Sequence, residues 1–145
     1  MDVKEYLNQI RVLQVKIKQR RAQAAELRDQ TQSLLSHRLK SDRVQTSNPA
    51  SPMEERVVKY LDIEREIAEL IDQLTGARNR IISDIHCLDD ERYIKVLYKR
   101  YVEGKKFTTI SRELNYSHVH TERLCRQAEQ AFSKKMMMND TFDIC

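Results

Sequence analysis

Glycine and proline are scarce in this chain, and their scarcity limits its possible folds more than any other feature. Its 145 residues include two glycines and two prolines. Sandwiches and barrels need many tight turns, which these residues supply. Both prolines lie between Ser41 and Met53, a segment that also holds three serines. The sequence therefore predicts an all-α fold of a few long helices, with a loop at about residues 41–53.

The segment before this loop has the repeat of a coiled-coil helix. Apolar residues recur at alternating intervals of three and four, which keeps one face turned toward a partner helix. Leu7 and Val15 widen this face, as expected for a helix with more than one neighbour. Arg20 interrupts it, either to set the register or with its charged end in solvent. The repeat comprises Val3, Tyr6, Ile10, Leu13, Ile17, Arg20, Ala24, Leu27, Thr31 and Leu34.

A second long helix is predicted from about Pro52 to the mid-eighties. Ser51, Pro52 and Glu54 match a helix start: a capping hydroxyl, a proline in the first turn and a glutamate three residues after the cap. Gly76 marks a break, a bend or a close helix contact, and the sequence leaves these three open. The apolar face comprises Val57, Tyr60, Leu61, Ile63, Ile67, Leu70, Ile71, Leu74, Ile81, Ile82, Ile85 and Leu88.

Opposite charges favour pairing of these two helices. Residues 1–40 carry a net charge of +5, and residues 54–90 carry −5. An antiparallel hairpin within one chain would bury both apolar faces, and pairing between two chains would do so equally well. A homodimer through the N-terminal helices is predicted, because two-fold dimers are the commonest soluble homo-oligomers.

The C-terminal part has the layout of a helix-turn-helix. An acidic start at Asp89 and a glycine stop at Gly104 delimit one helix. Its expected inward face is Tyr93, Ile94, Val96, Leu97 and Tyr101. A short helix follows, from Phe107 or Thr108 to Leu114. After a turn at Asn115, the last helix is expected to begin with Ser117 as its cap and to end near Phe132.

In such a motif the last helix enters the DNA major groove. A net charge of +6 over residues 91–135 suits a surface that contacts phosphates. The core positions fit at Ile110, Leu114, Tyr116 and Leu124, whereas Ser111 stands where alanine is usual and Thr121 where valine or isoleucine is usual. The residues predicted to meet base edges are Ser117, His118, Val119, Glu122, Arg123 and Arg126. Those predicted to contact phosphates are Lys105, Lys106, Thr109 and Arg112.

Residues 88–132 resemble region four of sigma factors, the module that reads the upstream promoter element. The matching features are Leu88 with the acidic stretch after it, Arg92, the run from Leu97 to Lys105, Ile110, Leu114, Tyr116-Ser117 and Leu124. With its long helical N-terminal half, the whole chain resembles small phage-encoded transcription regulators of the ArpU and RinA type. The resemblance implies sequence-specific control of phage or mobile-element genes, with RNA polymerase as a candidate partner.

Composition and motifs argue against an enzyme, a metal site and a membrane protein. No signal peptide and no apolar run of about 18 residues is recognisable, so a cytoplasmic protein is predicted. No Cys-x-x-Cys pair exists, and His118 and His120 diverge on a helix. Cys87 and Cys125 are expected to be small core residues. No catalytic residue, metal ligand or cofactor is therefore predicted.

The expected domains are a helical hairpin over residues 1–87, the helix-turn-helix over 88–135 and a disordered tail over 136–145. Two other functions stay open. A phage DNA-packaging recognition subunit also joins a helix-turn-helix to helical oligomerisation, although its DNA module usually comes first. A helical adaptor would instead bind protein through the last helices.

Overall fold

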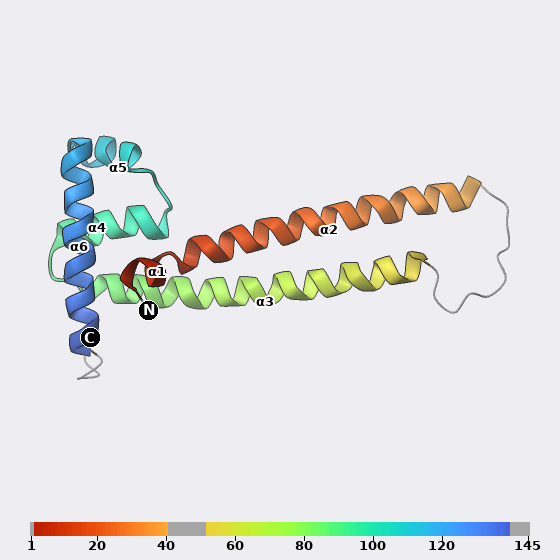
Figure 1. Cartoon of the computed structure of the whole chain (residues 1–145), viewed down its shortest axis with the longest axis horizontal. Coiled ribbons are helices and arrows are strands. Elements are labelled where there is room, and N and C mark those ends of the chain that lie inside the picture. The colour runs from red at the N-terminus through yellow and green to blue at the C-terminus, as the bar shows by residue number, and fades with distance from the viewer. Residues whose placement is uncertain (1, 41–51, 140–145) are drawn as a thin grey trace. The chain divides into compact units, whose positions relative to one another are not determined.

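The computed structural model describes residues 2–40 and 52–139, which are helical and contain no β-strand. A short helix, α1 (Val3–Leu7), precedes the long helices α2 (Gln9–Lys40) and α3 (Pro52–His86) (Figure 1). Next come α4 (Glu91–Leu97), the π-helical turn η1 (Tyr98–Val102), α5 (Phe107–Leu114) and α6 (His118–Asn139). The prediction of an all-α fold with an N-terminal helical hairpin and a C-terminal helix-turn-helix is confirmed.

The loop expected at about residues 41–53 lies mostly outside the described residues, as does the expected cap at Ser51. Pro52 and Met53 already belong to α3, which ends at His86 as the sequence predicted.

The helices divide into two compact units. The hairpin unit comprises residues 13–73, and the C-terminal unit joins the described residues 2–12 to residues 74–139. This division does not coincide with the boundary expected at residue 88. The reason is that Leu7, Ile10, Ile81 and Ile85 are buried in the same core as the helix-turn-helix.

In the hairpin unit, α2 and α3 run antiparallel along a narrow apolar contact (Figure 1). Ala24, Ile63 and Ile67 are buried there, with Leu27 and Tyr60 packed against them. An ion pair also joins the two helices, since Arg20 Nε lies 3.1 Å from Glu66 Oε2. Arg20, which interrupts the apolar repeat of α2, thus keeps its charged group exposed and pairs with the opposite helix.

The wide apolar faces expected for α2 and α3 are buried only in part. Leu61 is 56% exposed, Val57 is 41% exposed and Val15 is 47% exposed. Two helices that contact only each other can cover one narrow strip apiece, so residues to the side of that strip stay in solvent. Val15 is therefore largely uncovered within the described residues of one chain, and a neighbour from a second chain stays a prediction.

Gly76 lies within an uninterrupted α3, so it does not break the helix. A Cβ built on Gly76 would meet no atom within 4 Å, so the backbone makes no close helix contact there. Of the break, bend and close contact that the sequence left open at Gly76, the break and the close contact are excluded.

The C-terminal unit has a continuous core to which α1, the start of α2, the end of α3, α4, η1, α5 and α6 contribute. Its largest fully buried side chain is Phe132 of α6. The ring of Tyr6 stacks on that of Phe132, with 6.0 Å between centroids, and the Tyr6 hydroxyl donates to the Asp84 carboxylate. These contacts hold the N-terminal segment against both α6 and the end of α3.

The turn η1 changes which residues face this core. Val96 and Leu97 are fully buried, as their spacing predicted, and Tyr93, Ile94 and Tyr101 are partly buried. In η1 the Glu103 amide donates to the Tyr98 carbonyl five residues earlier, at 3.0 Å. The additional residue in this turn brings Val102 into the core, where α-helical spacing had not placed it.

The last helix is longer than the sequence predicted. It continues past Phe132 to Asn139, because Met136 still packs against the core. The expectation of a disordered tail is therefore wrong for residues 136–139, and residues 140–145 lie outside the described part.

Candidate nucleic-acid interface

Local backbone signals fix the start of α6. Asn115, between α5 and α6, has the left-handed conformation expected of it, with φ 58° and ψ 40°. Ser117 Oγ accepts a hydrogen bond from the His120 amide at 3.1 Å, which is the expected helix cap. Gly104, which ends the preceding helical segment, has φ +68°, a value that glycine adopts without strain. These residues set the path of the chain into the helix-turn-helix.

The two departures from the usual helix-turn-helix pattern contact each other. Ser111 of α5 and Thr121 of α6 are both buried, and their hydroxyl oxygens lie 3.0 Å apart. Ser111 Oγ also lies 2.6 Å from the Phe107 carbonyl oxygen, and Thr121 Oγ1 lies 2.9 Å from that of Ser117. Ser111 and Thr121 have one hydroxyl hydrogen each, so at most two of these three contacts are hydrogen bonds at any one time. A polar bridge here replaces the usual apolar contact between the helices.

A double-mutant cycle on Ser111→Ala and Thr121→Val should reveal this bridge. In each single variant the hydroxyl that remains can still donate to its own backbone carbonyl. Each variant should therefore lower the free energy of unfolding by no more than about 1 kcal/mol. Coupling of about 0.5–1 kcal/mol is expected between them, measured by urea unfolding of the four proteins. Strictly additive changes would mean that the Ser111–Thr121 hydrogen bond adds nothing.

One side of α6 points away from the core. Val119 is 62% exposed, and Arg123 and Arg126 are also exposed. The spacing of four and then three residues places these side chains in one row, called here the reading row. Gln130 continues the row at the next interval of four and is exposed. Sequence reasoning stopped at Arg126, although the same spacing would have included Gln130.

The other residues predicted to meet bases flank the start of this row. His118 Nδ1 lies 3.5 Å from Glu122 Oε1, one helical turn later. The His118 ring also meets the edge of Phe107 at 6.2 Å between centroids. Ser117 is exposed, but its hydroxyl already caps the helix. His120, which was not among the predicted DNA contacts, is exposed and packs edge-on against Tyr116, with 4.7 Å between ring centroids.

The residues predicted to contact phosphates differ in their availability. Lys106 and Arg112 are exposed, and Thr109 is partly exposed. Lys105 is instead engaged between two carboxylates, with Nζ 2.8 Å from Glu103 Oε2 and 2.8 Å from Glu113 Oε1.

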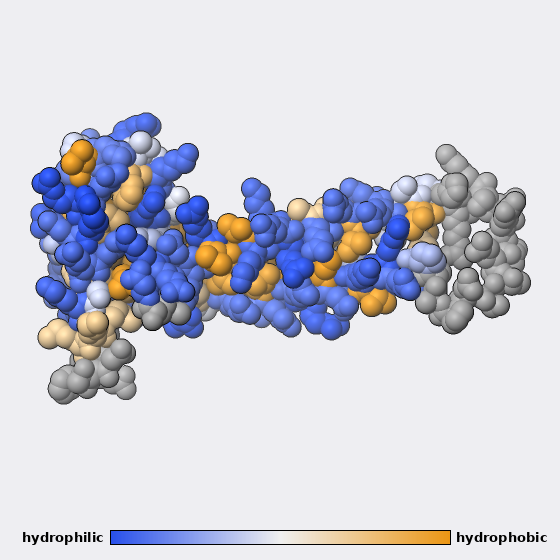
Figure 2. All heavy atoms as spheres, viewed as in Figure 1, coloured by the Kyte–Doolittle hydropathy of each residue, from blue (hydrophilic) through white to orange (hydrophobic). Residues whose placement is uncertain are grey.

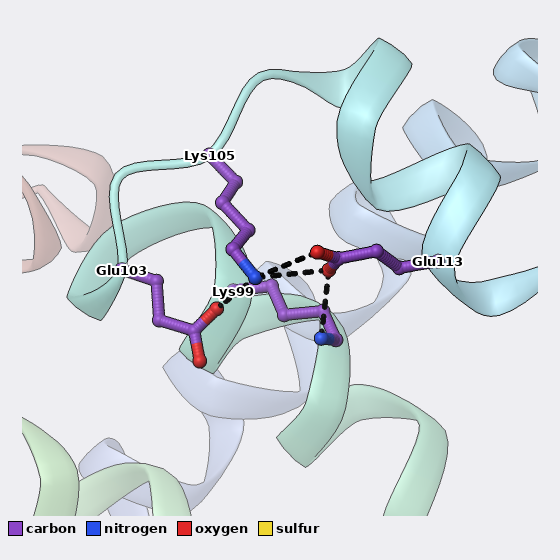
Figure 3. Close-up of polar contacts among 4 residues, drawn as sticks. All are labelled: Lys99, Glu103, Lys105 and Glu113. Carbon is purple, nitrogen blue, oxygen red and sulfur yellow. Dashed lines mark hydrogen bonds and ion pairs between the residues drawn. The ribbon is translucent and has the colours of Figure 1, made fainter.

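Lys99 completes this cluster, because its Nζ lies 2.8 Å from Glu113 Oε2 (Figure 3). The Glu103 and Glu113 carboxylates raise the pKa of Lys105, and the Lys105 and Lys99 ammonium groups lower the pKa of Glu113. This cluster ties α5 to η1 and to the turn before α5. Sequence reasoning missed it because Lys99 and Glu113 are 14 residues apart on different elements.

A partly buried polar cluster joins α6 to η1 and to the N-terminal segment. The Tyr101 hydroxyl donates to Glu129 Oε1 at 2.5 Å, and Lys4 Nζ lies 3.9 Å from Glu129 Oε2. Cys125 is buried, as predicted, and burial raises the pKa of its thiol to about 12. Such a thiol stays protonated and unreactive near neutral pH. Cys87, the other expected core cysteine, is only partly buried.

Comparison with family models, with curated proteins and with solved structures finds no match for this chain. Among residues 2–40 and 52–139, no cluster of three or more histidine, cysteine, aspartate or glutamate side chains could hold a metal ion. None of the helices in these ranges is long and apolar enough to cross a membrane.

Proposed function

We propose that this protein is a sequence-specific transcription regulator that binds double-stranded DNA and reads the major groove with α6. The observation that carries the proposal is the reading row: a valine and two arginines, exposed on one side of a helix whose start is fixed by the Asn115 turn and the Ser117 cap. In a helix-turn-helix, exposed residues near the N-terminal end of the second helix contact base edges in the major groove.

The side chains of α6 suit direct readout of bases. Arginine can bind O6 and N7 of guanine with two hydrogen bonds, which fits Arg123 and Arg126. Val119 can contact a thymine methyl group, and Glu122 can accept from a cytosine amino group. Ser117 and His118 can contact bases or sugars at the edge of the groove.

Phosphate contacts would set the orientation of α6 without reading sequence. Lys106, Thr109 and Arg112 are accessible for this role. Lys105 could take part only by exchanging its carboxylate partners for phosphate. The proposed cellular setting is the cytoplasm, with phage or mobile-element genes as targets, a homodimer as the active form and RNA polymerase as a candidate partner. The target genes and RNA polymerase rest on the resemblance to sigma region four and to the ArpU and RinA regulators. The cytoplasmic setting rests on the sequence, and the homodimer rests on the apolar helix faces and on the frequency of two-fold dimers.

Arg123→Ala and Arg126→Ala should each weaken binding to the preferred sequence by about 1–3 kcal/mol if they read bases. A uniform loss on all sequences would make them phosphate contacts instead. Binding is measured by fluorescence anisotropy at near-physiological salt, because salt governs the phosphate contribution. Lys59→Ala, which removes an exposed positive charge from the hairpin unit, is the matched control and should leave affinity unchanged.

The decisive experiment is selection of bound duplexes from a random library, with the Arg123→Ala/Arg126→Ala double variant alongside. A recovered motif that the double variant loses would support reading by α6. Binding without any motif would favour a DNA-packaging or architectural role. Recovery of no duplex, even at low salt, would contradict DNA binding and favour a helical adaptor that binds protein.

A further inference from the structure

The hairpin unit exposes a second apolar stripe on α3, separate from the strip that contacts α2. It comprises Val57, Leu61, Ala68 and Ile71, all exposed. Their spacing places them on one face, about 100° around the helix from the buried Ile63 and Ile67. Figure 2 shows apolar residues at the surface of the hairpin among the polar ones. Helices with two apolar faces about a quarter-turn apart are typical of four-helix bundles, in which each helix has two neighbours.

The stripe and a basic row on α2 lie on the same side of the hairpin. The opposite side carries a polar groove whose lining includes Lys16, Arg20, Glu66 and Glu69. Helical spacing places the α3 stripe on the side away from this groove. On that side α2 presents an exposed row with partly apolar character, because the stems of long basic side chains can cover apolar surface. The row comprises the exposed Lys18, Arg21 and Arg28, with the small, partly buried Ala25 between them.

Charge selects what can cover the stripe. Residues 13–36 of α2 include five basic and two acidic residues, whereas residues 52–73 of α3 include three basic and seven acidic residues. A second α3 laid on the stripe would bring acidic helices together, with two copies of Glu64 close to the symmetry axis. A second α2 would instead place basic residues against acidic ones, and like charges opposed across an interface are unfavourable.

We propose that two copies of this chain form an antiparallel four-helix bundle in which the α3 stripe of each copy packs on the basic α2 row of the other. The symmetry axis runs along the bundle, so each α3 lies between its own α2 and the second copy's α2. The Arg20–Glu66 ion pair sets which residues of α2 and α3 lie at the same height along the hairpin. Because the symmetry axis runs along the bundle, this register also holds between copies. Leu61 then lies opposite Ala25 of the second copy, and Glu64 lies opposite Arg21 of the second copy.

This inference deepens the proposed function, in which a homodimer is the active form, by naming its interface. In this bundle both copies of α3 point in the same direction, so their ends at residue 73 lie together. The two C-terminal units would then attach to one end of the bundle. A palindromic binding site follows if the two reading helices are displayed symmetrically.

Sedimentation equilibrium of the full chain tests the interface. The wild type should sediment at twice the chain mass of 17.2 kDa. Leu61→Lys should sediment as a monomer, because it buries an ammonium group in the apolar contact. Val15→Lys is the matched control: it also replaces an exposed apolar residue, but on the outer side of α2, and should remain a dimer.

Charge reversal provides a second test of the interface, one that does not depend on apolar packing. Arg21→Glu and Glu64→Arg should each weaken the dimer by about tenfold or more, whereas the double variant should recover most of the wild-type affinity. Far-ultraviolet circular dichroism would confirm that each variant stays helical. Both residues are exposed, so reversal of their charge should leave the folded monomer intact.

Three results would overturn the inference. They are a wild-type monomer at all concentrations, equal dissociation by Val15→Lys and Leu61→Lys, and a charge-reversed double variant as weak as the single variants. Failure here is distinguishable from failure of DNA reading. A monomeric protein that still selects a half-site motif would reject the bundle and keep the proposed function, whereas a dimer that selects no duplex would do the reverse.

Discussion

Phe132→Ala is expected to destabilise the C-terminal unit by about 3–5 kcal/mol, the range found when a buried aromatic side chain is truncated. Phe132 is 1% exposed and is the largest fully buried side chain described. Its ring stacks on Tyr6, so truncation would also loosen the N-terminal segment from α6. A loss of this size is a large part of the stability of a typical domain.

Urea unfolding monitored by circular dichroism measures this effect. Met137→Ala is the matched control, because Met137 lies on the same helix but is 71% exposed and should cost less than about 0.5 kcal/mol. Phe132→Leu should fall between the two, since it retains part of the apolar volume. If Phe132→Ala and Met137→Ala were equally mild, the core assignment of α6 would be wrong.

The element boundaries of this protein are readable from its sequence because they depend on local chemistry. Asp90 caps α4 by accepting from the Arg92 amide at 2.9 Å, close to where the acidic stretch predicted a helix start. Gly104 and Asn115 have the positive φ values that their residue types favour. Each of these features involves neighbouring residues, so no knowledge of the tertiary structure was needed.

Features that depend on distant residues could not be predicted in this way. Tyr6 and Asp84 are 78 residues apart, and their contact explains why the N-terminal segment belongs to the C-terminal unit. The π-helical turn that buries Val102 leaves no trace in the apolar spacing. Ser111 and Thr121 looked like two separate defects of the helix-turn-helix, but in space they are partners.

The candidate interface shows the same limit. Exposure of Val119, Arg123 and Arg126 follows from helical spacing, which the sequence contains. The pairing of Lys105 with two glutamates cannot be deduced from helical spacing, because it depends on how the turn before α5 folds back on η1. The count of basic residues therefore overstates the charge available to DNA.

The C-terminal unit should lose stability steeply between about pH 9 and pH 12. Burial raises the pKa of Tyr6 to about 12, helped by its hydrogen bond to Asp84. Burial likewise raises the pKa of Cys125 to about 12, and burial with the Glu129 contact raises that of Tyr101 well above its usual value. In the unfolded chain these groups lose their protons near pH 8.5 for cysteine and near pH 10 for tyrosine.

The sign follows from proton counting. Above pH 9 to 10 the unfolded state binds fewer protons than the folded state, so the free energy of unfolding falls as pH rises. Each fully shifted group contributes at most about 1.4 kcal/mol per pH unit within its window. Solvent screening lowers this bound for the partly buried Tyr6. The stabilisation is complete below about pH 8 and is lost as the pH rises from there toward the folded pKa values.

Tyr6→Phe isolates one contribution, because lysine titration and other alkaline effects are common to both proteins. The variant should be less stable than wild type at pH 8 by about 1 kcal/mol, since it lacks the hydrogen bond to Asp84. Its stability should then fall less steeply between pH 10 and 12, so that the two curves converge. Parallel urea-unfolding curves across this window would contradict the prediction, because they would mean that Tyr6 titrates alike in the folded and unfolded states.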